Sequence, residues 1–262
     1  MTQSPKRSAR EQFDRQAEHY NAQWNAWSEE TLDWLLENAR PDKQDQALDV
    51  ATGTGFTALA FAPHVRSVIG IDVSPGMLAQ ARRRAEEQGI TNVTFQEGAA
   101  EAFPFPDGTF DLVTCRIAPH HFLSVPQFLQ ETARVLKPGG RFLLVDTCVP
   151  DGDPEADIWQ NAVEALRDPS HVRNDTPSEW RERIQAAGLL VERMTSSGNG
   201  ITMRLSEWLE KAGCTPDQQE AVRRRFETAP PSAARAFRIT HEPGGETVFT
   251  WQRVLVRAIK PD

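Results

Sequence analysis

The fold is decided by the segment Leu48-Asp49-Val50-Ala51-Thr52-Gly53-Thr54-Gly55-Phe56, in which a short apolar run enters two closely spaced glycines. Glycine lets the backbone turn sharply and lets a ligand approach closely, because it carries no Cβ. A helix that begins after such a turn presents unpaired backbone N–H groups. In an open α/β sheet, ligands bind at the carboxyl ends of the strands. The segment therefore predicts a strand, a tight turn and a ligand-binding helix start.

Strand-like and helical stretches alternate on both sides of this turn. Apolar runs typical of strands lie at 47–51, 67–71, 92–95, 110–115 and 141–147, and helical patterns lie between them at 55–63, 75–88 and 125–136. This alternation predicts right-handed crossovers and a mostly parallel sheet covered on both faces. We expect a Rossmann-like α/β fold, with a seven-stranded, doubly wound sheet and an added helical lid.

The rest of the chain divides into parts of the sheet and parts that are expected to cover it. Thr176-Pro177-Ser178-Glu179 and Thr215-Pro216-Asp217-Gln218 are capping boxes, which predict helix starts. We expect N-terminal lid helices over 1–40, a ligand-binding α/β core over 41–150, a lid insertion over 151–176, a core helix and strand over 177–200, a helical lid insertion over 201–235, and C-terminal sheet strands over 236–262. A lid rich in Trp, Leu and Phe predicts a small ligand with apolar parts rather than a polymer.

Composition and charge exclude several classes of function. The chain has 262 residues, with 37 acidic and 29 basic side chains and a formal net charge of -8. A net negative charge argues against nucleic acid as the main partner. No apolar run reaches the ~18 residues that span a bilayer, and residues 1–12 are polar, without a secretion signal. The three cysteines are far apart and form no metal pair or disulfide framework. We expect a cytoplasmic protein, monomer or homodimer, without a metal.

Two cofactors fit the glycine turn. Asp72 ends the next strand candidate, where a carboxylate can accept hydrogen bonds from both hydroxyls of a ribose. One candidate is a dinucleotide, because Gly53, Gly55 and Ala58 satisfy the relaxed G-x-G-x-x-A pattern. The other is S-adenosyl-L-methionine. Asp49 favours the second, since dinucleotide sites usually keep an apolar residue at that place in the strand.

Three further motifs follow the third strand candidate and precede the fifth: Gly98-Ala99-Ala100-Glu101, the run from Phe103 to Val113, and Val135-Leu136-Lys137-Pro138-Gly139-Gly140. Together with the glycine turn, they resemble the class I S-adenosylmethionine-dependent methyltransferases. The resemblance is nearest to the branch that contains the ubiquinone/menaquinone C-methyltransferases and the YcgJ-type bacterial proteins. It covers about residues 45–147, and the segment 166–173 extends it into the lid insertion.

The resemblance implies S-adenosyl-L-methionine as the cofactor and S-adenosyl-L-homocysteine as the product. It implies that the methionine end is contacted by Asp49, Thr52, Gly53, Gly55, Arg116 and Ile117. It implies that Asp72 holds the ribose and that the adenine is bordered by Val73, Met77, Ala99 and Ala100. Tyr20 aligns with an N-terminal pattern, also containing Phe13 and Ala17, that closes over the cofactor.

In methyl transfer from a sulfonium, the cofactor already carries an activated methyl group. The protein therefore mainly orients the reactants and excludes water. A general base is needed only if the accepting atom carries a proton that must be removed. His120 and His121 follow the fourth strand candidate, and either could accept that proton. The alternative is that one of them packs its ring or bonds a backbone carbonyl. His171, with Asp168 and Arg173, is expected to form a capped loop with a surface ion pair, and the alternative is a role on the substrate side.

The predicted function is in-line methyl transfer to a small, partly apolar acceptor. One alternative is an NAD(P)-dependent oxidoreductase, for which no matching Tyr-x-x-x-Lys pair is found. The other is a non-catalytic protein that binds the adenosyl cofactor, in which side chains from 201–235 would fill the acceptor pocket.

Overall fold

The computed structural model of the chain describes residues 9–17, 25–196 and 200–262. Tyr20 lies outside the described residues. The strands are β1 (Gln46–Val50), β2 (Ser67–Asp72), β3 (Val93–Glu97), β4 (Phe110–Arg116), β5 (Leu136–Cys148), β6 (Leu190–Thr195), β7 (Ile201–Arg204), β8 (Thr240–His241) and β9 (Thr247–Ile259). The helices are α1 (Ala9–Gln16), α2 (Asn25–Ala39), α3 (Phe56–Phe61), α4 (Pro75–Glu87), α5 (Val125–Val135), α6 (Pro154–Arg167), α7 (Pro177–Ala186), α8 (Leu205–Lys211), α9 (Pro216–Glu227) and α10 (Pro231–Ala236).

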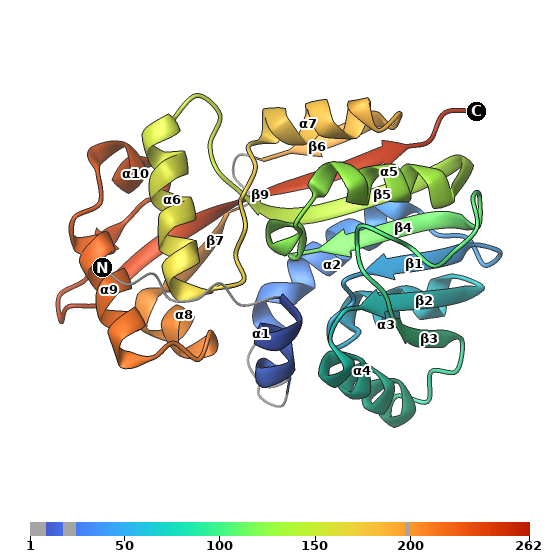
Figure 1. Cartoon of the computed structure of the whole chain (residues 1–262), viewed down its shortest axis with the longest axis horizontal. Helices are drawn as coiled ribbons and strands as arrows, with labels where there is room; N and C mark the ends of the chain where they lie inside the picture. Colours follow the sequence, from blue (N-terminus) through green and yellow to red (C-terminus); the bar gives the residue numbers. More distant parts are fainter. Residues whose placement is uncertain (1–8, 18–24, 197–199) are drawn as a thin grey trace.

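The strands form one sheet of order β3-β2-β1-β4-β5-β9-β6 (Figure 1). The strands from β1 to β5 are parallel, and β9 runs antiparallel between β5 and β6. One apolar cluster packs α5 and α7 on one face, and a second packs α2, α3 and α4 on the other. The predicted doubly wound α/β fold is confirmed.

The predicted number of strands was too low, since the described part of the chain has a nine-stranded sheet. The seven-stranded path is present, but β7 and β8 also pair with the first part of β9. Residues 252–259 of β9 pair with β5, and residues 248–251 extend beyond that edge. The exposed backbone groups there need partners, which β7 and β8 supply. The segment 201–235, predicted to be helical, therefore begins with a strand.

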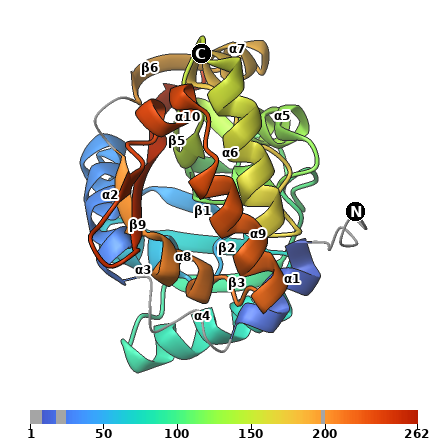
Figure 2. The ribbon, with the colours of Figure 1, turned by 90° about the vertical axis from the view of Figure 1, so that its left-hand side faces the viewer.

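The same end of β9 carries a separate layer, which we call the accessory layer and define as residues 154–167 and 201–251. Its own apolar cluster packs the rings of Trp159, Trp208, Phe226, Phe237, Phe249 and Trp251. Figure 2 shows α6 and α9 of this layer in front of the sheet. The carboxyl ends of the parallel strands point toward α1 and this layer (Figure 1). The sheet thus presents its ligand-binding edge to a second set of elements.

Candidate active site

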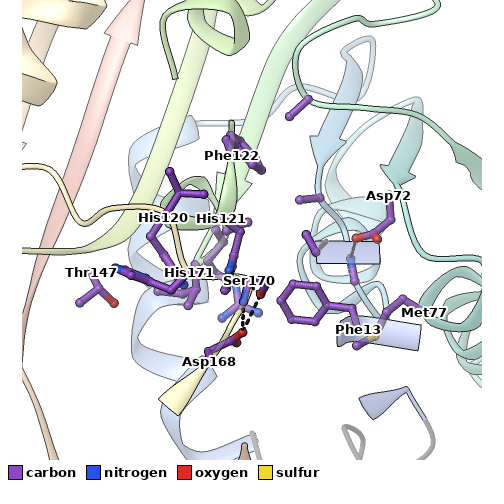
Figure 3. Close-up of a pocket in the computed structure, with 18 of the residues that line it drawn as sticks. Phe13, Asp72, Met77, His120, His121, Phe122, Thr147, Asp168, Ser170 and His171 are labelled. Carbon is purple, nitrogen blue, oxygen red and sulfur yellow. Dashed lines mark hydrogen bonds between the residues drawn. The ribbon is translucent and has the colours of Figure 1, made fainter. Parts of the chain in front are cut away.

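A cavity of about 750 Å³ lies at the carboxyl ends of β1, β2 and β4. Its walls come from α1, from the loops after these strands, from residues 164–172, and from the accessory layer. This volume lies in the range that small-molecule sites occupy. In Figure 3, Asp72 and Met77 lie on one side and the histidines on the other, with Phe13 between them.

The glycine turn borders the cavity through its first glycine. Gly53 has a φ of +54°, and a Cβ built on it would meet no atom within 4 Å. Such a Cβ would take up space in the cavity, which Gly53 lines. Gly55 (φ +85°) does not line the cavity in the described structure, and a Cβ there would come within 3.0 Å of Ala81 and Phe95. The second glycine therefore allows close packing behind the turn.

Asp72 is fixed at the end of β2 by two backbone hydrogen bonds. Its carboxylate accepts one from Gly53 at 2.8 Å and one from Ser74 at 2.9 Å, through different oxygens. Burial raises the pKa of Asp72, while these hydrogen bonds act in the opposite direction. Each oxygen keeps acceptor capacity, and the residue lines the cavity. The arrangement leaves a pre-oriented acceptor beside the turn.

A second acid, Asp49, lies under the turn and is only 2% exposed. Its two oxygens accept hydrogen bonds from the hydroxyls of Thr52 at 2.6 Å and Thr114 at 2.7 Å. Burial raises the pKa of Asp49 to about 6, although the two hydroxyls and Arg116 lower it. Asp49 therefore supports the turn and adds negative charge to this end of the cavity.

The cavity brings together most of the residues that the resemblance marks for the cofactor. Its lining includes Asp49, Thr52, Gly53, Asp72, Val73, Met77, Ala99, Ala100, Arg116 and Ile117. Arg116 donates from Nε to the hydroxyl of Thr57 at 3.0 Å, which orients its guanidinium at the wall. Phe13 of α1 also lines the cavity and meets the His121 ring edge-on, with centroids 5.0 Å apart.

His120 and His121 both line the cavity, but they have different partners. His120 Nδ1 lies 2.6 Å from an oxygen of Asp146, whose other oxygen accepts the His120 backbone N–H at 3.0 Å. His121 Nδ1 lies 3.0 Å from the Ser170 hydroxyl, which donates to Asp168 at 2.6 Å. The hydroxyl therefore accepts from His121 Nδ1–H, which leaves Nε2 of His121 unprotonated.

The loop around His171 differs from its prediction as a surface feature. Arg173 does lie outward, and it pairs with Asp157 at 2.9 Å and Glu179 at 3.0 Å. Asp168 and His171, however, are buried and line the cavity. His171 Nε2 lies 2.9 Å from the side-chain oxygen of Asn161. The only sequence signal for these residues was the motif at 166–173, because their position depends on the packing of α6 against the sheet.

The lining residues that follow were not predicted as site residues, although Arg167 belongs to the motif at 166–173. Arg167 stacks on Trp208, with its guanidinium carbon 4.3 Å from the ring centroid, and lies 3.7 Å from Glu164. Arg253 contacts Glu30 at 3.1 Å. Arg167, Arg253, Trp208 and Trp251 all line the cavity, so its wall includes cations as well as aromatic rings.

Two structural findings concern metals and membranes. Over residues 9–17, 25–196 and 200–262, no group of three or more His, Cys, Asp and Glu side chains is arranged to hold a metal ion. In the same ranges, no helix combines the length and apolar character that crossing a bilayer requires.

The amino-acid sequence of this chain is similar to those of known methyltransferases. Residues 47–140 match a family model described as a methyltransferase domain. A demethylmenaquinone methyltransferase of Symbiobacterium thermophilum is 42% identical over 153 residues, which cover 54% of this chain and 59% of that protein. Neither comparison supports the oxidoreductase alternative.

The similarity to one relative spans nearly the whole chain. The uncharacterized methyltransferase YcgJ of Bacillus subtilis is 36% identical over 249 residues, which cover 95% of this chain and 97% of that protein. The crystal structure of YcgJ matches this fold with a TM-score of 0.84, over 89% of this chain and 99% of that chain. The chain therefore belongs to the methyltransferase family that includes YcgJ.

Proposed function

We propose that this protein is an S-adenosyl-L-methionine-dependent methyltransferase that acts on a small, partly apolar acceptor. The observation that carries the proposal is the Asp72 carboxylate, held 2.8 Å from the Gly53 backbone N–H at the wall of the cavity. A carboxylate held in this way can accept both hydroxyls of a ribose. The space beside Gly53, which a Cβ would occupy, fits the close approach of a ligand.

The residues around the cavity fit the parts of this cofactor. Val73 and Met77 offer apolar surface to the adenine, and Ala99 and Ala100 border its edge. Asp49, Thr52, Arg116 and Ile117 surround the place proposed for the methionine end, where negative charge from Asp49 suits an amino group. Gly55 shapes the turn without lining the cavity. When bound, the cofactor supplies an activated methyl group, and the protein orients it and excludes water.

The acceptor is proposed to occupy the other half of the cavity, beside the histidines and the accessory layer. Met203, Trp208 and Trp251 provide apolar surface there. An apolar acceptor also agrees with the name of the Symbiobacterium relative, a demethylmenaquinone methyltransferase. Side chains from 201–212 line the cavity and leave its volume open, which favours an enzyme over a non-catalytic cofactor-binding protein.

Further parts of the proposal concern the protein as a whole. Segments 1–40, 151–176 and 201–235 are proposed to act as a lid, since α1 and the accessory layer face the carboxyl ends of the strands. The three cysteines are free, which supports a reducing compartment such as the cytoplasm. We propose a monomer or homodimer.

Calorimetry tests which cofactor the protein binds. Titration with S-adenosyl-L-homocysteine should release heat with one site per chain, whereas NAD should give none. Binding of NAD without binding of the adenosyl compound would contradict the proposal. A screen of metabolite extracts with isotopically labelled methyl donor, followed by mass spectrometry, would then identify the acceptor.

A further inference from the structure

The pairing of His120 with Asp146 differs from the environments of the other two histidines in the cavity. The Asp146 side chain is 1% exposed and lies at the end of β5, directly behind the His120 ring. Its oxygens accept hydrogen bonds from the backbone N–H groups of His120 at 3.0 Å and Thr147 at 2.9 Å. These contacts fix the carboxylate, which in turn fixes the ring through Nδ1 at 2.6 Å.

This geometry determines which ring nitrogen can act as a base. A carboxylate accepts, so Nδ1 of His120 carries the proton and Nε2 keeps its lone pair. Nε2 lies on the side of the ring away from Asp146. The His120 side chain remains 13% exposed and lines the cavity. Arg116 and Ile117, proposed for the methionine end, precede it by only a few residues and line the same cavity.

The charges around His120 favour a stronger base. Burial lowers the pKa of His120, but the charge and hydrogen bond of Asp146 outweigh it and raise the pKa above the usual 6.5. The titratable groups that face the ring are Asp146 from β5, Glu164 from α6, Asp168 and His171 from the following loop, and neighbouring His121. The two acids on and after α6 act in the same direction as Asp146.

The neighbouring histidines are weak bases by comparison. Burial and the charge of His120 lower the pKa of His121 to about 3. Burial, with the charges of His120 and His121, lowers the pKa of His171 to about 2. The rings lie close together, with the His120 centroid 4.2 Å from that of His121 and 5.8 Å from that of His171. A proton entering this cluster is therefore best held by His120.

We propose that His120 is the catalytic base, that Asp146 is its positioning residue, and that the acceptor is a phenol. This inference rests on the proposed methyltransferase function. A histidine base suits a phenol, because a phenolic hydroxyl (pKa about 10) is far more acidic than an aliphatic one. The rings of Phe13, Phe122 and Trp208 line the cavity and offer flat surface to an aromatic acceptor.

The proposed reaction moves one proton and one methyl group. The phenolic O–H bond breaks, and the proton passes to Nε2 of His120. The electron pair of the phenolate, from its oxygen or a conjugated ring carbon, forms a bond to the methyl carbon while the methyl–sulfur bond breaks. The sulfur keeps the electron pair of that bond. For attack through carbon, the ring C–H proton is then lost to solvent.

An NMR titration of the imidazole signals tests the pairing without any turnover. His120→Gln assigns the His120 signal, Asp146→Asn removes the charge, and His64→Gln, at an exposed position outside the cavity, serves as the matched control. We expect His120 in the wild type to titrate above the usual histidine pKa, and Asp146→Asn to move its midpoint to lower pH. A midpoint at or below 6.5 in the wild-type protein would overturn the inference, including when Asp146→Asn does not fold.

Absorbance spectra with phenol probes test the role as a base. The probes are para-nitrophenol, a nitrocatechol and a nitronaphthol, each added with S-adenosyl-L-homocysteine below the pH at which the free probe ionises. We expect the coloured phenolate to form with the wild type and His64→Gln, and to be lost with His120→Gln. No phenolate with any probe, or equal phenolate with His120→Gln, would overturn the inference.

Cofactor binding separates this inference from the proposed function. If calorimetry shows that S-adenosyl-L-homocysteine binds equally to the wild type and His120→Gln, the proposed cofactor site is supported, whichever result the phenol probes give. Absence of that binding in the wild type would overturn the proposed function itself.

Discussion

The carboxylate of Asp72 accepts a hydrogen bond from the backbone N–H of Gly53 at 2.8 Å, which ties the end of β2 to the turn after β1. Asp72 ends β2 and Gly53 follows the neighbouring parallel strand β1, so their distance depends on the register of β1 against β2. The same carboxylate also accepts from Ser74, the N-cap of α4. One side chain thus joins the turn, the strand and the helix that border the proposed nucleoside site.

Asp72→Asn should weaken binding of S-adenosyl-L-homocysteine by about tenfold to a hundredfold. The amide keeps the size of the side chain, but its NH₂ group would face either the Gly53 N–H or the Ser74 N–H and could not accept from a ribose hydroxyl. Each lost acceptor costs about 1–3 kcal/mol. Calorimetry gives the Kd. Asp217→Asn, at an exposed aspartate on α9, is the matched control and should bind like the wild type. Unchanged affinity for Asp72→Asn would show that the ribose is held elsewhere.

Gly53→Ala should weaken cofactor binding more than its loss of stability explains. Gly53 and Gly89 both have left-handed φ values, +54° and +66°, and a Cβ on either meets no atom within 4 Å. Each Ala substitution should therefore destabilise the protein by about 1–2 kcal/mol. Only Gly53 lines the cavity. Urea unfolding should give similar losses for both variants, while calorimetry should show weaker binding for Gly53→Ala alone; equal affinities would contradict the assignment.

Local patterns were enough to predict the sheet core and the residues at the glycine-turn end of the cavity. The glycine turn, the acid at the end of β2 and the Ser74 cap of α4 depend on residues close together in the chain. The added strand β7 could not be predicted in this way. The pairing of Ile201–Arg204 with β9 joins segments far apart in the sequence, and β7 is too short for a clear alternation.

The histidine end of the cavity was only partly predictable. His120 and His121 could be named because they follow a strand that ends at the binding edge. Asp146 also lies near the end of a strand, but its pairing with His120 depends on the parallel register of β4 and β5. The burial of Asp168 and His171 depends on how α6 packs, which local charge patterns describe as a surface loop.

Asp49 should make stability depend on pH. Its folded pKa of about 6 is higher than the ordinary 3.8, so the folded state binds its proton more tightly than the unfolded state. The stabilisation is fully present below pH 3.8 and is lost as the pH rises through 6. Between pH 5 and pH 8 this loss should reach about 1 kcal/mol. Urea unfolding at both pH values measures it.

Asp49→Asn should abolish that part of the pH dependence, because the amide does not titrate. Asp217→Asn should keep the wild-type difference between the two pH values, since Asp217 is exposed. An identical pH dependence in Asp49→Asn and the wild type would show that the carboxyl is already ionised at pH 5.

Trp208→Phe should weaken binding of the acceptor while leaving the cofactor in place. Trp208 lines the cavity and supports the guanidinium of Arg167, whose carbon lies 4.3 Å from the ring centroid. Trp180 is equally buried but packs in the cluster between α7 and the sheet. Both Phe variants should therefore lose stability, but only Trp208→Phe should raise KM for a phenol acceptor. Calorimetry with S-adenosyl-L-homocysteine should give unchanged Kd values, and a raised KM in Trp180→Phe would indicate a general loss of structure.

Methyl transfer to a phenol should depend on pH through His120. Only the neutral ring can accept a proton, so kcat/KM should rise as the pH passes the raised pKa of His120. His120→Gln should lower kcat/KM by about 10²–10⁴-fold and remove this rise. Asp146→Asn should move the rise to lower pH, because the buried negative charge no longer stabilises the protonated ring, and should lower the plateau, because the base is weaker. If Asp146 had a purely structural role, Asp146→Asn would lower the plateau of kcat/KM without moving the pH of its rise. Initial-rate assays across the pH range therefore distinguish a positioning role from a folding role.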